Sequence, residues 1–245
     1  MVSLLVKSAK LLGIQGVDKN NIQRVLEQQK VIYTLSPALF TRPLEWTQNI
    51  KLLGYHERDK VLDWRPSEAL LALLRTEQDV LFITFGSMTN RDPKKHTEML
   101  LKILVRNNIA AVINTYSGGL LKPEGWNNPD IIFVDSIPYD WIFEKVTAVM
   151  HHGGAGTTHM ATKYECPSLI IPHAVDQFVW DQIIYERQLG PKGMAMGKLS
   201  ELKLQSKIID LMSNKIYRAN AKAVAAEMKN EQDLADKLCR EIILD

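Results

Sequence analysis

Residues 148–159 read AVMHHGGAGTTH, and no other stretch says more about the architecture of this chain. An apolar run ends in two histidines, three glycines follow within four residues, and a segment of helical character comes next. This order predicts a strand, a tight turn and a helix from Thr157 to Tyr164, with free backbone N–H groups and a helix N-terminus at the mouth of the strand. Proteins hold a phosphate or pyrophosphate in this way.

The glycines of this turn, Gly153, Gly154 and Gly156, allow a ligand to approach the backbone because no Cβ stands in the way. The amides of Ala155, Gly156 and Thr157, with the dipole of the helix behind them, favour negative charge there. A tight turn whose glycines serve geometry alone is the structural alternative.

A dinucleotide-binding loop of the Rossmann type is a more specific alternative to the phosphate-binding turn. In the spacing Gly154-x-Gly156-x-x-His159 a histidine replaces the third glycine of that motif. Asp176 also lies several residues past its strand rather than at its end. These departures weaken a nicotinamide site and leave the phosphate site in place.

His151 and His152 stand where the strand stops, so one of them can donate a hydrogen bond to a phosphate oxygen. By position we expect His151 to contact the ligand and His152 to pack or to bond in support. A zinc site is not expected, because no third ligand has suitable spacing.

Asp176 and Gln177 follow the next apolar run, Ser168 to Ile171, at the start of a predicted helix. A carboxylate and an amide suit vicinal sugar hydroxyls, each of which donates and accepts a hydrogen bond. A plain helix N-cap explains Asp176 equally well. Together with the phosphate turn, the pair indicates a nucleotide-sugar site.

From residue 80 onward, apolar strands alternate with helices. This alternation predicts an α/β protein with a doubly wound parallel sheet covered on both faces. Ligands bind such a sheet outside the carboxyl ends of its strands. The turns expected at that edge are Gly86-Ser87, Ser136-Ile137-Pro138, residues 151–157 and Asp176-Gln177.

The composition is that of an ordinary globular protein of 245 residues, with 46% hydrophobic and 24% charged residues. A net charge of +2, from interspersed basic and acidic residues, gives no reason to expect nucleic acid. The distant Cys166 and Cys239 argue against a disulfide scaffold. No apolar run approaches the roughly 18 residues of a spanning helix, and the start does not read as a signal peptide. We therefore expect a cytoplasmic protein, at most peripheral to a membrane.

Taken together, these residues resemble the UDP-glycosyltransferases of the two-domain GT-B type, in particular the sterol glucosyltransferases and related bacterial enzymes that glycosylate lipids or natural products. The likeness spans roughly residues 31–245. It rests on Tyr33 to Leu39, Phe85-Gly86-Ser87-Met88, Ile137 to Phe143, residues 151–158, Asp176 to Trp180 and Leu189-Gly190-Pro191.

The resemblance implies a Rossmann-like donor-binding half of a GT-B fold. The implied reaction is inverting and needs neither metal nor cofactor: a hexose such as glucose passes from a UDP-sugar to a hydroxyl of a hydrophobic, sterol-like acceptor. The implied donor contacts are Gly86, Ser87 and Gly153 to Thr157 with His151 at the diphosphate, Ser136 and Ile137 at the base, and Asp176 and Gln177 at the sugar.

Two positions depart from plant members of the broad family. Ser136 stands where those members carry a tryptophan that stacks on uracil. His159 stands where they place a glutamate for the ribose.

The likeness also implies a division of the chain. Residues 1–55 correspond to the last helix and strand of the acceptor-side domain with its linker, and residues 56–245 to the donor domain, ending in a crossing helix over 231–244. The histidine that activates the acceptor precedes this region, so we assign no catalytic residue here. A non-catalytic subunit that needs a separate acceptor-domain chain is the alternative, and a nicotinamide-dependent oxidoreductase is a further one.

Overall fold

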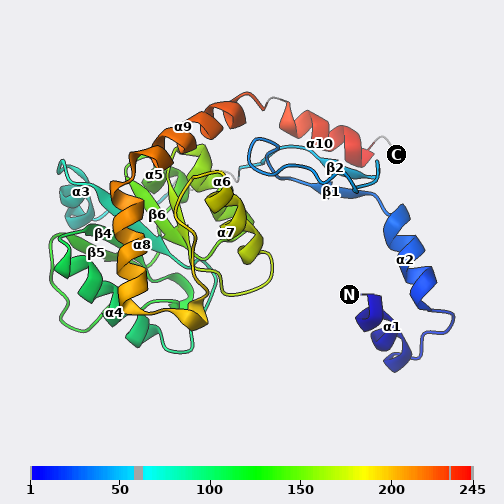
Figure 1. Ribbon diagram of the computed structural model, residues 1–245, viewed down its shortest axis with the longest axis horizontal. Helices are drawn as coiled ribbons and strands as arrows, with labels where there is room; N and C mark the ends of the chain where they lie inside the picture. The colour runs from blue at the N-terminus through cyan, green and yellow to red at the C-terminus, as the bar shows by residue number, and fades with distance from the viewer. Residues whose placement is uncertain (1, 58–62, 232, 244–245) are drawn as a thin grey trace.

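The computed structural model describes residues 2–57, 63–231 and 233–243. Figure 1 shows a larger α/β body joined to a smaller part that contains the N-terminus. Five parallel strands in the order β5-β4-β3-β6-β7 form the central sheet of the body. They are β3 (Val80–Thr84), β4 (Ala110–Asn114), β5 (Ile131–Val134), β6 (Ala148–His151) and β7 (Ser168–Ile170).

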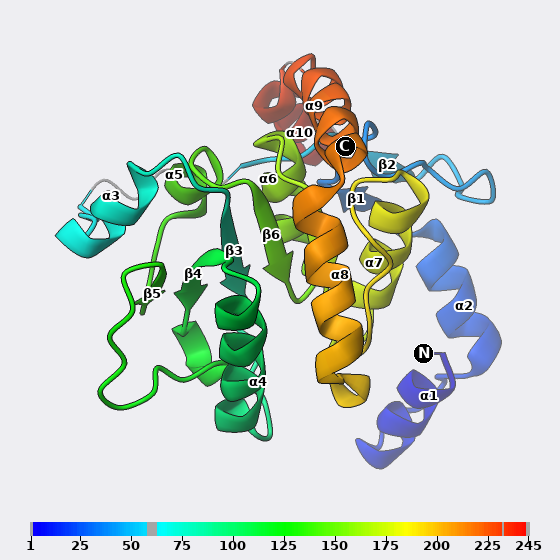
Figure 2. The same ribbon diagram turned by 60° about the vertical axis from the view of Figure 1, so that its left-hand side comes forward.

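Helices cover both faces of this sheet. Leucines and isoleucines of α4 (Pro93–Arg106) and α8 (Glu201–Ser213) pack on one face. The other face is covered by α3 (Glu68–Leu74), α5 (Tyr139–Phe143) and α6 (Ala155–Lys163). Figure 2 shows α4 and α8 together in front of the strands. The predicted fold class, a doubly wound parallel α/β sheet, is confirmed.

A third apolar cluster joins the edge of the sheet to the rest of the chain. It contains Trp180 of α7 (Gln177–Glu186), Val224 of α9 (Lys215–Lys229) and Leu39 from the N-terminal part. Two short 3-10 turns, Tyr116–Gly118 and Met196–Lys198, complete the body.

The smaller part consists of α1 (Val2–Leu11), α2 (Lys19–Gln28) and a two-stranded parallel sheet of β1 (Val31–Tyr33) and β2 (Ile50–Leu52). The last helix, α10 (Leu234–Ile243), lies along this small sheet (Figure 1). Lys30 Nζ pairs with the carboxylate of Glu241 at 3.0 Å. The division of the chain at residues 55 and 56 stays a prediction.

Polar contacts connect the two parts. The carboxylate of Glu231 accepts the hydroxyl of Ser36 and the N–H of Tyr55, the latter at 3.2 Å. The N–H of Ser36 donates to Nε2 of His159 in α6 at 3.1 Å, and the ring of Tyr55 stacks on His159. The chain entering the body and the chain leaving it therefore meet beside α6.

Within the described residues, no helix combines the length and the apolar composition needed to cross a bilayer.

Candidate functional site

A cavity of about 460 Å³ lies at the carboxyl edge of the central sheet. It is lined from the loops that follow β3, β4, β5 and β6, as expected for a ligand site of an open α/β sheet. The lining residues are Gly86, Ser87, Asn114, Tyr116, Ser136, Ile137, Tyr139, His152, Gly154, Gly156 and Thr157.

The N-terminus of α6 forms one wall of this cavity. The helix begins at Ala155, two residues earlier than the predicted Thr157, and Gly154 is its N-cap. Because Gly154 has no side chain, no side-chain hydrogen bond caps the helix. The first-turn amides have no partner within the helix, so they and the helix dipole offer this wall to an anion.

The surroundings of the three glycines in the turn differ, so a side chain would have a different effect at each position. Gly153 has a φ of +90°, and a Cβ there would stand 2.6 Å from Ile170 Cγ2. A Cβ on Gly154 would stand 2.4 Å from Nε2 of His152. A Cβ on Gly156 would meet no protein atom within 4 Å, so the space beside it is open.

The two histidines are placed in the reverse of the expected order. Successive side chains of a strand point to opposite faces, so only one of two neighbours can face the cavity. His152 lines the cavity, and its ring lies against Gly86 and Gly154. His151 is wholly buried below the turn, where its Nδ1 accepts the N–H of Gly153 at 3.1 Å. The proton of the neutral His151 ring is then on Nε2, which has no hydrogen-bond partner in the part of the chain that the structure describes.

Both imidazoles are neutral at physiological pH. Burial and, to a smaller extent, the neighbouring His152 together lower the pKa of His151 to about 3. Burial, then His173, lower the pKa of His152 to about 4, although Asp176 acts in the opposite direction. The attraction of this wall for an anion therefore comes from backbone amides rather than from histidine charge.

These pKa values predict a loss of stability in acid. The folded-state pKa of each ring lies below the unfolded value of about 6.5, so the unfolded chain takes up protons first. We expect the free energy of unfolding to have its full value above pH 6.5. Below pH 6.5 it should fall by up to about 1.4 kcal/mol per pH unit for each of the two histidines. Denaturant titrations at several pH values measure the slope, and His152→Asn should reduce it. Imidazole NMR signals of His151 and His152 that titrate near pH 6.5 would contradict this prediction.

Asp176 and Gln177 are positioned by β7 and α7 beside the glycine turn, but neither lines the cavity. Asp176 occupies the N-cap position of α7 and makes no side-chain cap bond, so its exposed carboxylate is not used for capping. Gln177 is buried, and its Oε1 accepts the N–H groups of His173 at 2.7 Å and Ala174 at 3.1 Å. Gln177 therefore holds its own loop in this structure.

Of the remaining residues predicted for the site, some line the cavity and others do not. Ser87, Ser136 and Ile137 line the cavity as expected, whereas the side chains of His151 and Ala155 and the backbone of Gly153 do not. Of the four predicted turns, those after β3, β5 and β6 therefore line one cavity, and the turn after β7 lies outside its lining.

The sequence interpretation missed Asn114, Tyr116 and Tyr139 as lining residues. Asn114 ends β4, and the same rule that selected the other four turns could have selected this one. The hydroxyl of Thr84 organises the floor: it lies 2.8 Å from the Tyr139 hydroxyl and accepts the N–H of Gly86 at 3.2 Å.

His159 is not part of the cavity. It is fully buried, its Nδ1 lies 2.7 Å from the carbonyl of Ala155, and its Nε2 accepts the N–H of Ser36. These partners fix the Nδ1–H tautomer and leave no nitrogen for a ribose hydroxyl. His159 instead ties the first turn of α6 to the N-terminal part.

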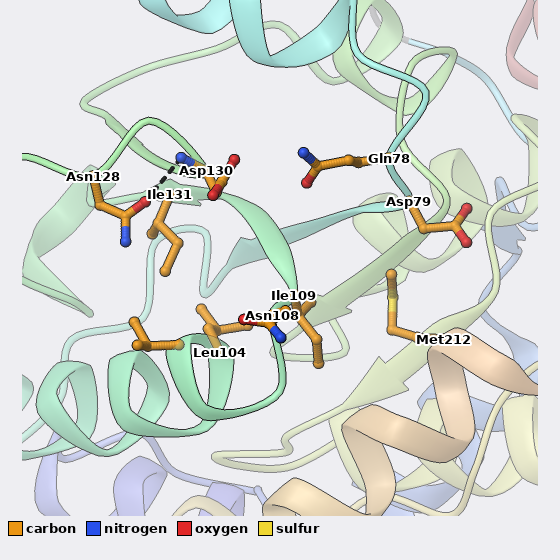
Figure 3. Close-up of a pocket in the computed structure, with 10 residues that line it drawn as sticks. Gln78, Asp79, Leu104, Asn108, Ile109, Asn128, Asp130, Ile131 and Met212 are labelled. Carbon is orange, nitrogen blue, oxygen red and sulfur yellow. Dashed lines mark hydrogen bonds between the residues drawn. The ribbon is translucent and has the colours of Figure 1, made fainter.

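A larger cavity, of about 600 Å³, opens at the opposite, amino-terminal edge of the sheet (Figure 3). Asp79 and Asp130 stand at its wall, and Leu104, Ile109 and Met212 supply apolar surface. It has no glycine turn, and its two carboxylates would repel a phosphate. Size alone therefore does not identify the site, and the chemistry favours the cavity at α6.

Comparison with known proteins agrees with this geometry. Residues 110–240 match the family described as "Erythromycin biosynthesis protein CIII-like, C-terminal domain". A sterol 3-beta-glucosyltransferase of Arabidopsis thaliana is 32% identical over 206 residues, covering 83% of this chain and 32% of that protein. The enfumafungin synthase of Hormonema carpetanum is 31% identical over 208 residues, covering 85% of this chain and 16% of that protein. The chain thus spans a third or less of the length of these relatives.

Solved structures show the same fold. A structure described as the glycotransferase of kitacinnamycin aligns with a TM-score of 0.75 at 14% identity, covering 98% of this chain and 61% of the other. A calicheamicin glycosyltransferase aligns with a TM-score of 0.69 at 17% identity, covering 98% and 60%. The architecture is that of the C-terminal half of GT-B glycosyltransferases.

Proposed function

Because the chain belongs to the family of erythromycin biosynthesis protein CIII-like C-terminal domains, we propose that it binds the UDP-sugar donor of an inverting, metal-independent glycosyltransferase. The acceptor we propose is a hydroxyl of a sterol-like or otherwise hydrophobic molecule, and the transferred group is a hexose such as glucose. The sterol 3-beta-glucosyltransferases among the relatives support this choice.

One observation carries the proposal: an uncapped helix N-terminus faces a cavity at the carboxyl edge of a parallel sheet. The amides of Ala155, Gly156 and Thr157 would donate hydrogen bonds to the diphosphate, with Ser87 opposite. The helix dipole adds a fixed partial positive charge that needs no counter-ion.

The order of the strands supports one direction for the ligand. Neighbouring strands are spaced by about 4.8 Å, so the ends of β5 through β7 span roughly 19 Å. In the proposed pose the base lies near Ser136 and Ile137 after β5, the diphosphate lies near β3 and β6, and the sugar lies near Asp176 and Gln177 after β7.

The donor groups present support chemistry without a metal. The lining residues include no aspartate or glutamate, the ligands that a diphosphate-bound Mg²⁺ requires. As the acceptor hydroxyl attacks the anomeric carbon from the opposite face, the bond to the diphosphate breaks and negative charge grows on UDP. The α6 amides would stabilise that charge, which is the same task that an oxyanion hole performs. We assign the base that deprotonates the acceptor to no residue of this chain.

Removing the Ser87 hydroxyl is expected to weaken donor binding. Ser87→Ala loses one hydrogen bond to a charged oxygen, so the Kd for UDP-glucose should rise about tenfold, or roughly 1.5 kcal/mol. Calorimetry in EDTA measures this Kd, and Ser213→Ala is the matched control, because the Ser213 hydroxyl donates to the carbonyl of Ile209 within α8, away from the cavity lining. Binding that appears only after Mg²⁺ is added would contradict the metal-independent proposal, and no binding of any uridine diphosphate compound would contradict the function itself.

A further inference from the structure

Tyr116 stands on the wall of the cavity, in the short turn that follows β4. Tyr116 is 56% exposed although it lines the cavity, so its side chain is open to a ligand that enters there. Among the described residues, the Tyr116 ring makes no aromatic contact and its hydroxyl makes no hydrogen bond, so neither interaction fixes the ring to the rest of the fold.

The turn that carries Tyr116 is firmly held. The Oδ1 of Asn114 accepts the N–H of Tyr116 at 3.0 Å. The hydroxyl of Thr115 donates to the carboxylate of Asp135 at 2.9 Å, which joins the ends of β4 and β5. Ser117 then takes a left-handed φ of 60°, so the chain reverses directly after the ring. The position of Tyr116 is therefore set by the ends of two strands.

The ring lies where the base of the proposed donor would lie. β4 is two strands from β6, which places Tyr116 roughly 10 Å from the α6 amides along the sheet edge. A ribose and part of a diphosphate bridge that gap. β4 also neighbours β5, whose following loop provides Ser136 and Ile137.

The other two aromatic rings of the lining, those of His152 and Tyr139, offer no free face. His152 is only 8% exposed, and its ring lies against Gly86 and Gly154. Ser136 has no ring. Tyr139 is directed into the core, where it packs on Phe82 and Phe143 and its hydroxyl contacts Thr84. A pyrimidine bound between β4 and β5 would therefore find one exposed π-face among the lining side chains, that of Tyr116.

We propose that Tyr116 is the stacking platform for the uracil base. The assignment rests on the proposed donor function and adds the residue that recognises the base. Stacking on an aromatic side chain typically accounts for about a tenfold or larger part of the affinity for a base, and the phenol hydroxyl is not needed for it.

The test compares UDP with inorganic pyrophosphate by calorimetry. Tyr116→Ala should weaken UDP binding about tenfold and leave pyrophosphate binding unchanged, because pyrophosphate has no base. Tyr116→Phe should bind UDP as the unsubstituted protein does. Tyr185→Ala, which removes a half-exposed tyrosine of α7 outside the cavity lining, is the matched control and should change neither ligand.

The other outcomes distinguish a failure of the stacking proposal from a failure of the proposed donor function. Equal UDP affinity of Tyr116→Ala and the unsubstituted protein would overturn the platform and leave the donor function standing. A parallel loss of pyrophosphate affinity in Tyr116→Ala would also overturn it, since the ring would then support the turn rather than the base. If the unsubstituted protein bound pyrophosphate but not UDP, the proposed function would fall together with the platform.

Discussion

Replacing Gly156 by valine should abolish donor binding and leave the fold intact. A Cβ at this position meets no protein atom within 4 Å, and the backbone has no positive φ, so a β-branched side chain can begin here without a clash at its β-carbon. The same side chain would fill the space that a diphosphate needs to reach the α6 amides. We expect the Kd for UDP-glucose to rise at least about a hundredfold, or roughly 2.7 kcal/mol.

The stability of this variant is the decisive control. Glycine inside a helix is less favourable than valine by a few tenths of a kcal/mol, so the melting temperature should stay the same or rise slightly. Calorimetry gives the affinity and thermal unfolding gives the stability. Gly156→Val that binds UDP-glucose as tightly as the unsubstituted protein would exclude the α6 amides as the diphosphate site. Substitutions of Gly153 or Gly154 are not suitable for this test, because the added side chain would disturb the fold itself. A Cβ on Gly153 would collide with Ile170, and a Cβ on Gly154 would collide with His152.

The second large effect concerns folding. A Cβ on Gly190 would stand 1.8 Å from the carbonyl oxygen of Ser168 and 2.8 Å from its carbon, both backbone atoms of β7. This contact cannot relax without moving the strand, because the N–H of Ser168 also donates to the carbonyl of Leu189 at 2.9 Å. Gly190→Ala should therefore cost more than about 4 kcal/mol and lower the melting temperature by about 10 °C or more.

Gly197→Ala is the matched control for Gly190→Ala. Nothing lies within 4 Å of its Cβ position and its φ is ordinary, so its melting temperature should stay within about 2 °C of the unsubstituted value. Denaturation followed by circular dichroism makes both comparisons. A Gly190→Ala protein as stable as Gly197→Ala would mean that the chain after α7 does not pass against β7 in this way.

Much of the fold follows from local patterns. Continuous, mainly apolar runs such as residues 80–85 and 148–150 predict buried parallel strands, and the central sheet contains a strand at each, β3 and β6. Pro93 predicts the first turn of α4, where it is found. The helix after the glycine turn begins earlier than predicted, because Gly154 needs no side chain to serve as an N-cap.

The candidate site was harder to predict where long-range contacts decide a side chain's role. The sequence cannot show which of His151 and His152 faces outward, because the answer depends on the faces of β6 and its neighbours. The partner of His159, the backbone of Ser36, is 123 residues distant along the chain. Tyr116 was overlooked for a different reason: its turn has no glycine beside the strand end, and only the assembled edge shows that it lines the cavity.

The most direct measurement is a titration of ¹⁵N-labelled protein with UDP-glucose in EDTA, followed by amide NMR. We predict that the largest shifts belong to the N–H groups of Ala155, Gly156 and Thr157, with smaller shifts at Ser87 and Tyr116. Shifts confined to residues at the opposite edge of the sheet, around Asp79 and Asp130, would contradict the placement of the donor at α6, and so would an unchanged spectrum.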